Sequence, residues 1–283
     1  MINSSGKCLL CSKIQSISFK EKINYCPDCD FAWVEESKEN LKPAPEVESN
    51  ENVWKHSKTK LFINGLNLLE KMLPLKGKLL DIGTGFGYFL DMARQRGWKV
   101  SGIEIEQKAF DFATNNYKLE IFNKPIPELN IPDNTYDAVT LWIVLEQLPD
   151  PKGEMRNIFR ILKPGGVVYI RVYNFSFHRL LLNISRFLNI IFKMSPSVIH
   201  SYNFTSKSLR MIIKDTGFED INITNSPASS GDSYSTGGIF GSGLVELAKR
   251  IIYITAQFIA LITFNKLLLA STLIAIARKP GKQ

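Results

Sequence analysis

Leu79-Leu80-Asp81-Ile82-Gly83-Thr84-Gly85-Phe86-Gly87 is the stretch that decides the fold. An apolar run leads into an acid and then into glycine at every second position. Because glycine lacks a Cβ, such a loop can turn tightly and let its backbone approach a ligand closely. A strand followed by a glycine-rich turn and a helix is how α/β proteins hold nucleotide-like cofactors. The stretch therefore predicts an α/β fold with a cofactor loop at the end of a strand.

Strand-like and helix-like segments alternate from this loop onward. We predict strands over residues 78–82, 99–103, 119–122, 136–141 and 167–172. Helices are predicted between them over residues 88–96, 107–117 and 151–162. Repeated β-α-β units imply a parallel sheet with helices on both faces. The rest of the chain predicts a helix, a strand, a long apolar helix and a final strand over residues 205–215, 218–224, 244–269 and 272–277.

The glycine loop reads D-x-G-x-G-x-G, whereas dinucleotide dehydrogenases use G-x-G-x-x-G. This form resembles motif I of the class I S-adenosylmethionine (SAM) dependent methyltransferases. The loop at 141–151 and the turn Leu162-Lys163-Pro164-Gly165-Gly166 are similar to later motifs of that family, and residues 200–205 resemble a segment of zinc-ribbon-bearing type 11/12 methyltransferases. The resemblance implies a Rossmann-like, doubly wound sheet of seven strands in the order 3-2-1-4-5-7-6, with the last strand antiparallel.

The resemblance also implies SAM as the cofactor, bound beyond the carboxyl ends of the strands. Asp81 stands at the tip of the first strand of this sheet, where its carboxylate can pair with the amino group of SAM or orient the loop. Gly83, Thr84, Gly85 and Gly87 form that loop and are expected to contact the cofactor.

A second acid supports the cofactor site. Glu104 ends the next strand and follows Gly83 by 21 residues, the spacing of an acid that accepts hydrogen bonds from ribose hydroxyls. The alternative is an acid at a strand end that is bonded only to backbone. Ile105 and Asn123, at neighbouring strand tips, are expected beside the adenine.

The chain has four cysteines, all within its first 29 residues and arranged as two C-x2-C pairs: Cys8, Cys11, Cys26 and Cys29. This spacing matches a zinc ribbon, in which Zn²⁺ supplies the folding energy of a segment too short to fold alone. Two disulfides or four unrelated thiols are the alternatives. Residues 1–13 lack the apolar stretch of an export signal, which favours a reducing, cytoplasmic setting and hence Zn²⁺. Ser12 and Asp30 stand where such knuckles have glycine, so less regular knuckles are expected.

The cysteine pairs, the composition and the family resemblance together divide the chain into segments. We predict a zinc ribbon over residues 1–35, a linker over 36–52 and a methyltransferase domain over 53–283, with apolar insertions at 175–199 and 239–270. Hydrophobic residues make up 45% of the 283 residues, which allows a packed core, and the net charge is +8. The basic residues are scattered, so nucleic acid is not the expected partner, whereas an acidic lipid surface, a phosphorylated substrate or a merely solvated surface stay open.

Two segments, 175–199 and 244–269, are both apolar and basic. One interpretation is that they cap the active site and pack on each other. The other is peripheral contact with the inner face of a membrane, for a lipid-linked acceptor such as a quinone precursor or a polyprenyl-linked sugar. The uncharged run at 251–265 is shorter than the ~20 residues that span a bilayer.

The acceptor side departs from the family pattern. Ile143 and Gln147 stand where relatives commonly have histidine, and Asn203 replaces the second histidine of the 200–205 segment. His200 is the best candidate for a catalytic base, with a structural histidine as the alternative. A methyl group on sulfonium needs mainly alignment, so the missing histidines do not exclude activity.

These patterns predict a SAM-dependent methyltransferase that acts on an oxygen or carbon of a small-molecule or lipid-linked acceptor. The alternative is a non-catalytic, methyltransferase-like module whose zinc ribbon binds a partner or nucleic acid. A nicotinamide oxidoreductase is disfavoured by the spacing of the glycines.

Overall fold

The chain forms two compact units in the computed structural model, which describes residues 7–13, 17–18, 23–34, 51–181, 199–227 and 242–281. We call residues 1–58, 172–209 and 223–274 the ribbon unit. We call residues 59–171, 210–222 and 275–283 the sheet unit. Nearly all of the predicted linker at 36–52 lies outside the described residues, and so do residues 182–198 and 239–241 of the predicted insertions. The domain boundaries therefore stay a prediction.

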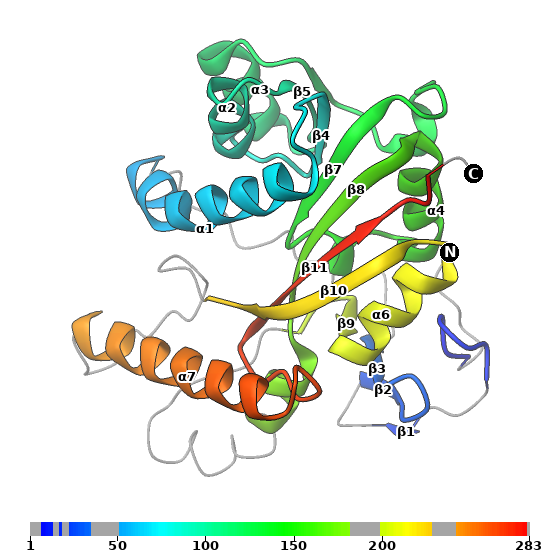
Figure 1. Cartoon of the computed structure of the whole chain (residues 1–283), viewed down its shortest axis with the longest axis vertical. Helices are drawn as coiled ribbons and strands as arrows, with labels where there is room; N and C mark the ends of the chain where they lie inside the picture. The colour runs from blue at the N-terminus through cyan, green and yellow to red at the C-terminus, as the bar shows by residue number, and fades with distance from the viewer. Residues whose placement is uncertain are drawn as a thin grey trace. The chain divides into compact units, whose positions relative to one another are not determined.

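A seven-stranded sheet has the order β10-β11-β8-β7-β4-β5-β6 (Figure 1). Its strands are β4 (Lys78–Ile82), β5 (Lys99–Ile103), β6 (Ile121–Phe122), β7 (Tyr136–Trp142), β8 (Leu162–Tyr173), β10 (Glu219–Ser226) and β11 (Thr272–Arg278). When the strands are numbered along the chain from β4 and the sheet is read from its β6 edge, the order is 3-2-1-4-5-7-6. The predicted topology is therefore confirmed. Strands β8, β10 and β11 have residues in both units.

The sheet is mixed, with its last strand antiparallel. Strand β4 pairs in parallel with β5 and β7, and β7 pairs in parallel with β8. The backbone of Lys279, just past β11, exchanges hydrogen bonds of 2.9 and 2.8 Å with Gly165 and Gly166 at the start of β8. At the other end of β8, the Asn174 N–H donates to the Ser271 carbonyl. Strand β8 begins earlier than the predicted residue 167 because Leu162 already pairs with Tyr136 of β7, and Gly165 and Gly166 pair with Lys279.

One helix precedes the first strand of this sheet, and the others lie between its strands in sequence. They are α1 (Glu51–Met72), α2 (Tyr88–Gln95), α3 (Gln107–Tyr117), α4 (Pro151–Ile161) and α6 (Ser206–Asp215), with short 3-10 turns η1 (Ile126–Glu128) and η2 (Leu145–Gln147). The Glu106 carboxylate caps α3, and the Asp150 carboxylate caps α4. The central strands are apolar on both faces, as at Leu79, Leu80 and Val139, which are fully buried. Continuous apolar runs of this kind belong to parallel strands covered on both sides.

A four-stranded sheet with the order β1-β2-β3-β9 lies in the ribbon unit. Its strands are β1 (Ile17–Ser18), β2 (Ile23–Cys26), β3 (Phe31–Val34) and β9 (Tyr202–Phe204). Strand β3 pairs antiparallel with β9, and Phe31 is the partner of Phe204. The Phe31 ring also stacks on Tyr202 at 6.2 Å between centroids. The cysteine-rich start of the chain is therefore completed by a strand from far along the sequence.

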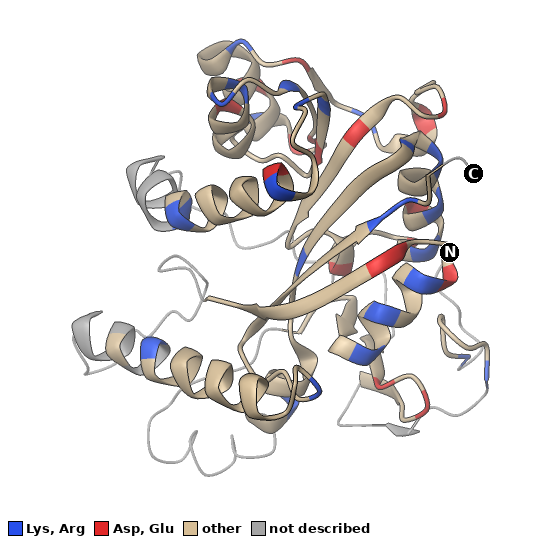
Figure 2. Ribbon diagram, viewed as in Figure 1, with Lys and Arg blue, Asp and Glu red and all other residues tan. Residues whose placement is uncertain are grey.

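Helix α7 (Ser242–Ile262) also belongs to the ribbon unit. It ends earlier than the predicted residue 269, because Phe264 and Asn265 adopt positive φ angles of 52° and 58°. Figure 2 shows that α7 carries little charge along its described length: it has blue (Lys or Arg) but no red (Asp or Glu). Among the helices that the structure describes, none is long and apolar enough to cross a membrane.

Candidate functional site

The glycine loop follows β4 in the sheet unit and takes a backbone path that side chains would obstruct. Gly83, Gly85 and Gly87 all have positive φ, at 70°, 55° and 80°. A Cβ on Gly83 would lie 2.5 Å from the side chain of Val144, so packing alone excludes one there. A Cβ on Gly85 would meet no atom within 4 Å. The backbone at Gly85 therefore borders open space, as a loop that receives a ligand must.

Glu104, the predicted ribose acid, lies against this loop. Its Oε2 accepts a hydrogen bond from the Gly85 N–H at 2.7 Å, and its Oε1 accepts one from the Glu106 N–H at 2.8 Å. Burial raises the pKa of Glu104, while these backbone donors oppose the rise. Glu104 thus joins the end of β5 to the loop after β4, and each of its oxygens accepts a backbone hydrogen bond.

Asp81, the other predicted acid, is almost fully buried at the end of β4. Its Oδ1 accepts a hydrogen bond of 2.5 Å from the hydroxyl of Thr140 on β7. Burial raises the pKa of Asp81 to about 7, and the Thr140 hydroxyl partly offsets the rise. The carboxyl is therefore poised to ionise near neutral pH, and a cation beside it would favour the ionised form.

Ile105 and Asn123, the residues expected beside adenine, flank Glu104. The Ile105 side chain is 70% exposed, an unusual position for a large apolar residue. The Asn123 side chain donates to the Glu104 carbonyl at 3.0 Å, which links β6 to β5. Asp81, the three glycines, Glu104, Ile105 and Asn123 thus gather at the carboxyl ends of β4, β5 and β6, and Thr84 lies buried in the same loop.

Sequence reasoning missed a strained residue in the sheet unit. Ile143, directly after β7, has a φ of 61°, a conformation that a β-branched residue rarely adopts. Two hydrogen bonds hold it: the Ile143 N–H donates to the Arg171 carbonyl at 2.8 Å, and the Gln147 amide donates to the Ile143 carbonyl at 2.6 Å. Strain of this kind clusters at functional sites. No sequence signal announces it, since isoleucine normally favours extended backbone.

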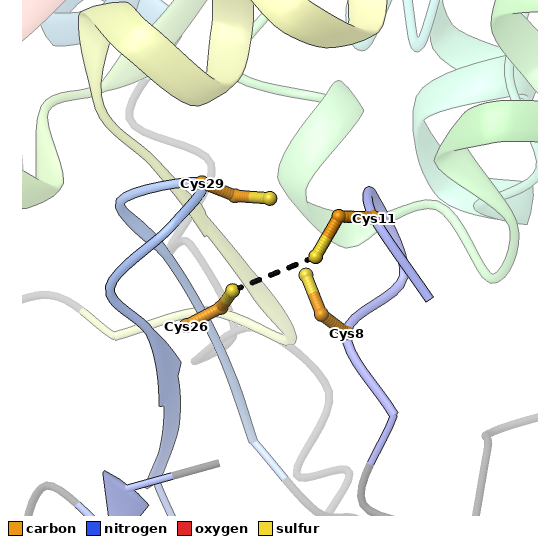
Figure 3. Close-up of side chains that lie close together, drawn as sticks. All are labelled: Cys8, Cys11, Cys26 and Cys29. Carbon is orange, nitrogen blue, oxygen red and sulfur yellow. Dashed lines mark hydrogen bonds between the residues drawn. The ribbon is translucent and has the colours of Figure 1, made fainter. Parts of the chain in front are cut away.

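The four cysteines form a separate cluster in the ribbon unit. They are free thiols, and their sulfur atoms all lie within 4.8 Å of one another (Figure 3). The Sγ atoms of Cys11 and Cys26 are 3.7 Å apart. A tetrahedral zinc ion with Zn–S bonds of about 2.3 Å separates its sulfur ligands by about 3.8 Å. The cluster therefore has the composition and spacing of a tetrathiolate zinc site.

Burial acts against ionisation of these thiols when no cation is present. It raises the pKa of Cys8 to about 11, and it also raises the pKa of Cys29. Four thiolates gathered in one place repel one another, so they need a shared positive charge. A divalent cation supplies that charge and deprotonates the thiols outright.

The two cysteine knuckles are regular despite their lack of glycine. Ser12 and Asp30 have φ angles of 60° and 53°, the left-handed conformation that glycine usually provides. Asp30 is held by its side chain, since Oδ1 accepts hydrogen bonds from Tyr25 Oη at 2.6 Å and from Arg179 Nη1 at 2.8 Å. The Asp30 carbonyl accepts a further bond from the Thr205 hydroxyl. The expected irregularity of the knuckles is therefore wrong at the level of the backbone.

His200, the predicted base, lies in the ribbon unit beside Tyr173. The two rings stack at 5.1 Å with an angle of 20° between their planes. Asn203 fixes the backbone of His200, accepting from its N–H and donating to its carbonyl. Burial lowers the pKa of His200 to about 4, and Nε2 has no hydrogen-bond partner among the described residues. His200 therefore holds a neutral ring with a vacant acceptor or donor position.

A family model described as a methyltransferase domain matches residues 53–223, more than half of the chain. The chain belongs to this methyltransferase family. The predicted class I methyltransferase family and its Rossmann-like sheet are thereby confirmed. The matched residues include the glycine loop, both acids and the strained Ile143.

Several curated relatives of this methyltransferase share a name, ubiquinone biosynthesis O-methyltransferase. The one from Coxiella burnetii (strain Dugway 5J108-111) is 28% identical over 143 residues, which are 48% of this chain and 61% of the relative. The one from Bordetella avium is 30% identical over 131 residues, 44% of this chain and 54% of the relative. The one from Paracidovorax citrulli is 27% identical over 195 residues, which are 60% of this chain and 80% of the relative. The chain spans about three fifths of the length of the Coxiella relative.

Solved structures share the fold of this methyltransferase. A SAM dependent methyltransferase from Archaeoglobus fulgidus covers 77% of this chain and 94% of its own, with 19% identity and a TM-score of 0.51. A chain of the complex between the Haloferax volcanii Trm112 methyltransferase activator and the putative methyltransferase covers 82% and 92%, with 17% identity and a TM-score of 0.54. At these identities the likeness shows the fold.

Proposed function

We propose that the protein transfers the methyl group of SAM to a hydroxyl oxygen of a small-molecule acceptor. The observation that carries the proposal is the glycine loop after β4, which is open at Gly85 and bordered by two carboxylates, Asp81 and Glu104, that hydrogen bonds already hold. Membership in the methyltransferase family supports methyl transfer. The shared name of the curated relatives supports oxygen, rather than carbon, as the acceptor atom.

SAM, when bound, supplies a methyl group that its sulfonium already activates, so the protein has mainly to align the reactants. Glu104 would accept hydrogen bonds from the ribose hydroxyls, and the Asp81 carboxylate would balance the positive amino group. The open backbone at Gly85 would let the cofactor approach the strand tips. Ile105 would cover one face of the adenine, and the exposed Asn123 amide would border its edge.

We propose that His200 orients the acceptor hydroxyl. Its lowered pKa of about 4 keeps the imidazole neutral at physiological pH, so that a ring nitrogen can accept a hydrogen bond. A hydroxyl that donates this bond gains electron density on its oxygen, which favours attack on the methyl group, and the proton that the oxygen must lose would pass along the bond to His200 and from there to water. The stack on Tyr173 and the two bonds from Asn203 hold His200 in one orientation.

We also propose that Cys8, Cys11, Cys26 and Cys29 hold one structural Zn²⁺. The sulfur spacing and the absence of disulfides among these cysteines support it. All four coordination positions would be taken by thiolates, which leaves no position for substrate. The ion would therefore stabilise the ribbon unit and take no part in methyl transfer.

We also propose a lipid-linked acceptor and a cytoplasmic location at the inner face of a membrane. What supports them is the apolar and basic character of residues 175–199 and 244–269. An acceptor with an apolar tail would be met at a lipid surface, whereas a tail-free acceptor would be taken from water.

Calorimetric titration with SAM and with S-adenosylhomocysteine tests the cofactor site. Wild-type protein is expected to bind both, and Glu104→Ala is expected to weaken binding by about 100-fold through loss of the ribose and Gly85 bonds. Glu128→Ala, which removes an exposed acid of the same unit, is the matched control and is expected to bind like wild type. Negligible affinity of the wild-type protein for both compounds would overturn the proposal.

Transfer of a labelled methyl group from SAM then tests the acceptor. The panel contains a catechol with an isoprenoid tail, the same catechol without the tail, and an arylamine. Methylation of a catechol oxygen supports the proposal, and preference for the tailed catechol supports a lipid-linked acceptor. Tight SAM binding without methylation of any compound would favour the non-catalytic module instead.

A further inference from the structure

Among the described residues of helix α7, a row of large apolar side chains faces outward and two alanines face inward. Leu247, Ile251, Ile254, Phe258 and Leu261 recur at intervals of three and four residues, which places them in one stripe along the helix. Their side chains are 53 to 73% exposed. Ala256 and Ala260 on the other side are only 2% exposed. A helix that merely covered a core would show the reverse arrangement, since burial of large apolar groups is what stabilises it.

The rotation of α7 about its axis is fixed by hydrogen bonds within the ribbon unit. The buried Asn225 side chain on β10 donates to the Ala256 carbonyl at 3.0 Å and accepts from the Ala270 N–H at 3.0 Å. Asn174 donates to the Leu268 and Ala270 carbonyls at 2.9 and 2.8 Å. These buried amides hold both the inner face of α7 and the segment that follows it. The ribbon unit therefore holds α7 with this apolar stripe on its outer face.

The turn after α7 extends the exposed apolar surface. Phe264 is 86% exposed and has a φ of 52°, a conformation that bulky residues rarely adopt. Backbone bonds hold this turn, because the Phe264 N–H donates to the Leu261 carbonyl at 3.2 Å and the Asn265 N–H donates to the Ala260 carbonyl at 2.7 Å. Glycine would relieve the strain at this position, and the chain places a phenylalanine there instead.

Positive charge flanks the stripe. The exposed Arg250 lies near its start and the exposed Lys266 lies just past its end. From Leu247 to the last residue the sequence contains no aspartate or glutamate. An apolar face bordered by basic residues is complementary to the anionic headgroups and acyl chains of a phospholipid surface. A second copy fits worse, because an antiparallel pair of these helices would set Arg250 opposite the other copy's Lys266.

We propose that the outer face of α7, together with Phe264, lies in the headgroup region of an anionic phospholipid bilayer. The apolar stripe would enter the boundary between headgroups and acyl chains while Arg250 and Lys266 contact lipid phosphates. The helix would lie parallel to the surface. This proposal does not depend on methyl transfer, because its contacts belong to α7 and the turn after it.

Vesicle flotation of the full chain tests the proposal. Wild-type protein is expected to float with phosphatidylcholine vesicles that contain 30% phosphatidylglycerol, and at least about tenfold more weakly with pure phosphatidylcholine, since each basic residue near an anionic surface adds ~1 kcal/mol. The triple variant Ile254→Ser, Phe258→Ser, Leu261→Ser is expected to lose binding to both. The double variant Arg250→Glu, Lys266→Glu is expected to lose only the preference for anionic vesicles.

Matched control variants distinguish loss of membrane contact by α7 from a general effect of the substitutions on surface or folding. Leu75→Ser removes an exposed leucine of the sheet unit, Lys124→Glu reverses an exposed charge there, and both are expected to float like wild type. Circular dichroism and urea denaturation of the triple variant report that the chain still folds. Phe258→Trp is expected to shift its emission to the blue on anionic vesicles and to be quenched by brominated acyl chains, whereas Leu75→Trp is not.

Three results would overturn the proposal. One is wild-type protein that does not float with anionic vesicles. Another is a triple variant that floats as well as wild type. The third is a wild-type dimer that the triple variant converts to a monomer without any vesicle binding, which would assign the face to a second copy.

Discussion

The Gly85 N–H donates a hydrogen bond of 2.7 Å to Oε2 of Glu104, so the residue expected to bind ribose also shapes the glycine loop. Gly85 and Glu104 are 19 positions apart in sequence and follow the ends of the neighbouring strands β4 and β5. Replacement of Glu104 therefore changes the loop as well as the ribose contact. Glu104→Gln separates these roles, since it keeps an oxygen acceptor and removes the charge.

We expect Glu104→Gln to bind SAM about tenfold more weakly than wild type, less severely than Glu104→Ala, because one neutral acceptor remains. Calorimetry at constant pH measures this. Equal affinities of the glutamine and alanine variants would contradict a contribution from hydrogen bonding to the loop.

Alanine substitutions at Gly83 and Gly85 are expected to affect different properties of the protein, stability at the first and SAM affinity at the second. Gly83→Ala is expected to lower the free energy of unfolding by roughly 2 kcal/mol, because its new Cβ meets Val144 and its φ is positive. Gly85→Ala adds a methyl group to open space, so it is expected to cost less stability but more SAM affinity. Urea denaturation and calorimetry on both variants measure the two effects. A Gly85→Ala variant that binds SAM normally would show that the cofactor does not approach this backbone.

The buried Asp81 predicts a pH dependence of stability. Its pKa is raised from 3.8 to about 7 in the folded protein, so between these values the folded state holds a proton that the unfolded chain lacks. The free energy of unfolding is therefore expected to fall as the pH rises through this window and to level off above it, by roughly 4 kcal/mol in all. Asp81→Asn keeps an acceptor for Thr140 and is expected to remove the slope. Urea denaturation of both proteins from pH 5.5 to 8 measures the upper part of this change, about 2 kcal/mol, and parallel curves would contradict the assignment.

The ion pair of Asp30 and Arg179 predicts the rate of zinc release. Arg179 Nη1 holds Asp30 in its left-handed conformation beside Cys29, and both side chains are partly buried. Arg179→Ala is expected to speed transfer of zinc to a chromogenic chelator about fivefold, the equivalent of ~1 kcal/mol. Lys13→Ala removes the exposed pair with Asp28 near the same cluster and is the control. Equal rates for the two variants would show that Arg179 does not stabilise the knuckle.

His200 predicts a split between rate and cofactor binding. His200→Ala is expected to lower kcat about 100-fold, the usual contribution of a residue that assists proton removal, with unchanged SAM affinity. His200→Gln retains a hydrogen-bond acceptor and is expected to recover part of the rate. Because the pKa of His200 is about 4, the pH–rate profile should show no ionisation of this residue near pH 6.5. A variant that loses SAM affinity and rate together would assign His200 a structural role.

Local patterns predict the parts of the molecule that depend on neighbours in sequence. The glycines of the loop predict open space beside its backbone, and the distance from Gly83 to Glu104 predicts an acid next to that loop. The two C-x2-C pairs predict a cluster of four thiols. The structure has each of these features. The order of the strands comes from the family resemblance together with the alternation of elements. Roles of individual residues toward SAM, zinc and acceptor stay predictions.

Other features have no local signal. The bond between Asp81 and Thr140 joins residues 59 positions apart, and the positive φ of Ile143 contradicts its own propensity. The direction in which α7 turns its large side chains depends on Asn225, which sits on a strand that precedes it. Apolar content predicts that α7 touches something apolar, but only tertiary hydrogen bonds decide which face is left exposed.

The pairing of β3 with β9 has a consequence for synthesis of the protein. At ordinary translation rates, roughly 10 to 30 s pass between the appearance of Phe31 and that of its partner Phe204 at the ribosome. During that time the edge of β3 that will pair with β9 is unpaired, and an unpaired strand edge promotes aggregation. Fragments that stop before residue 202 keep that edge for good, so chaperone demand should concentrate on truncated chains rather than on the full-length polypeptide.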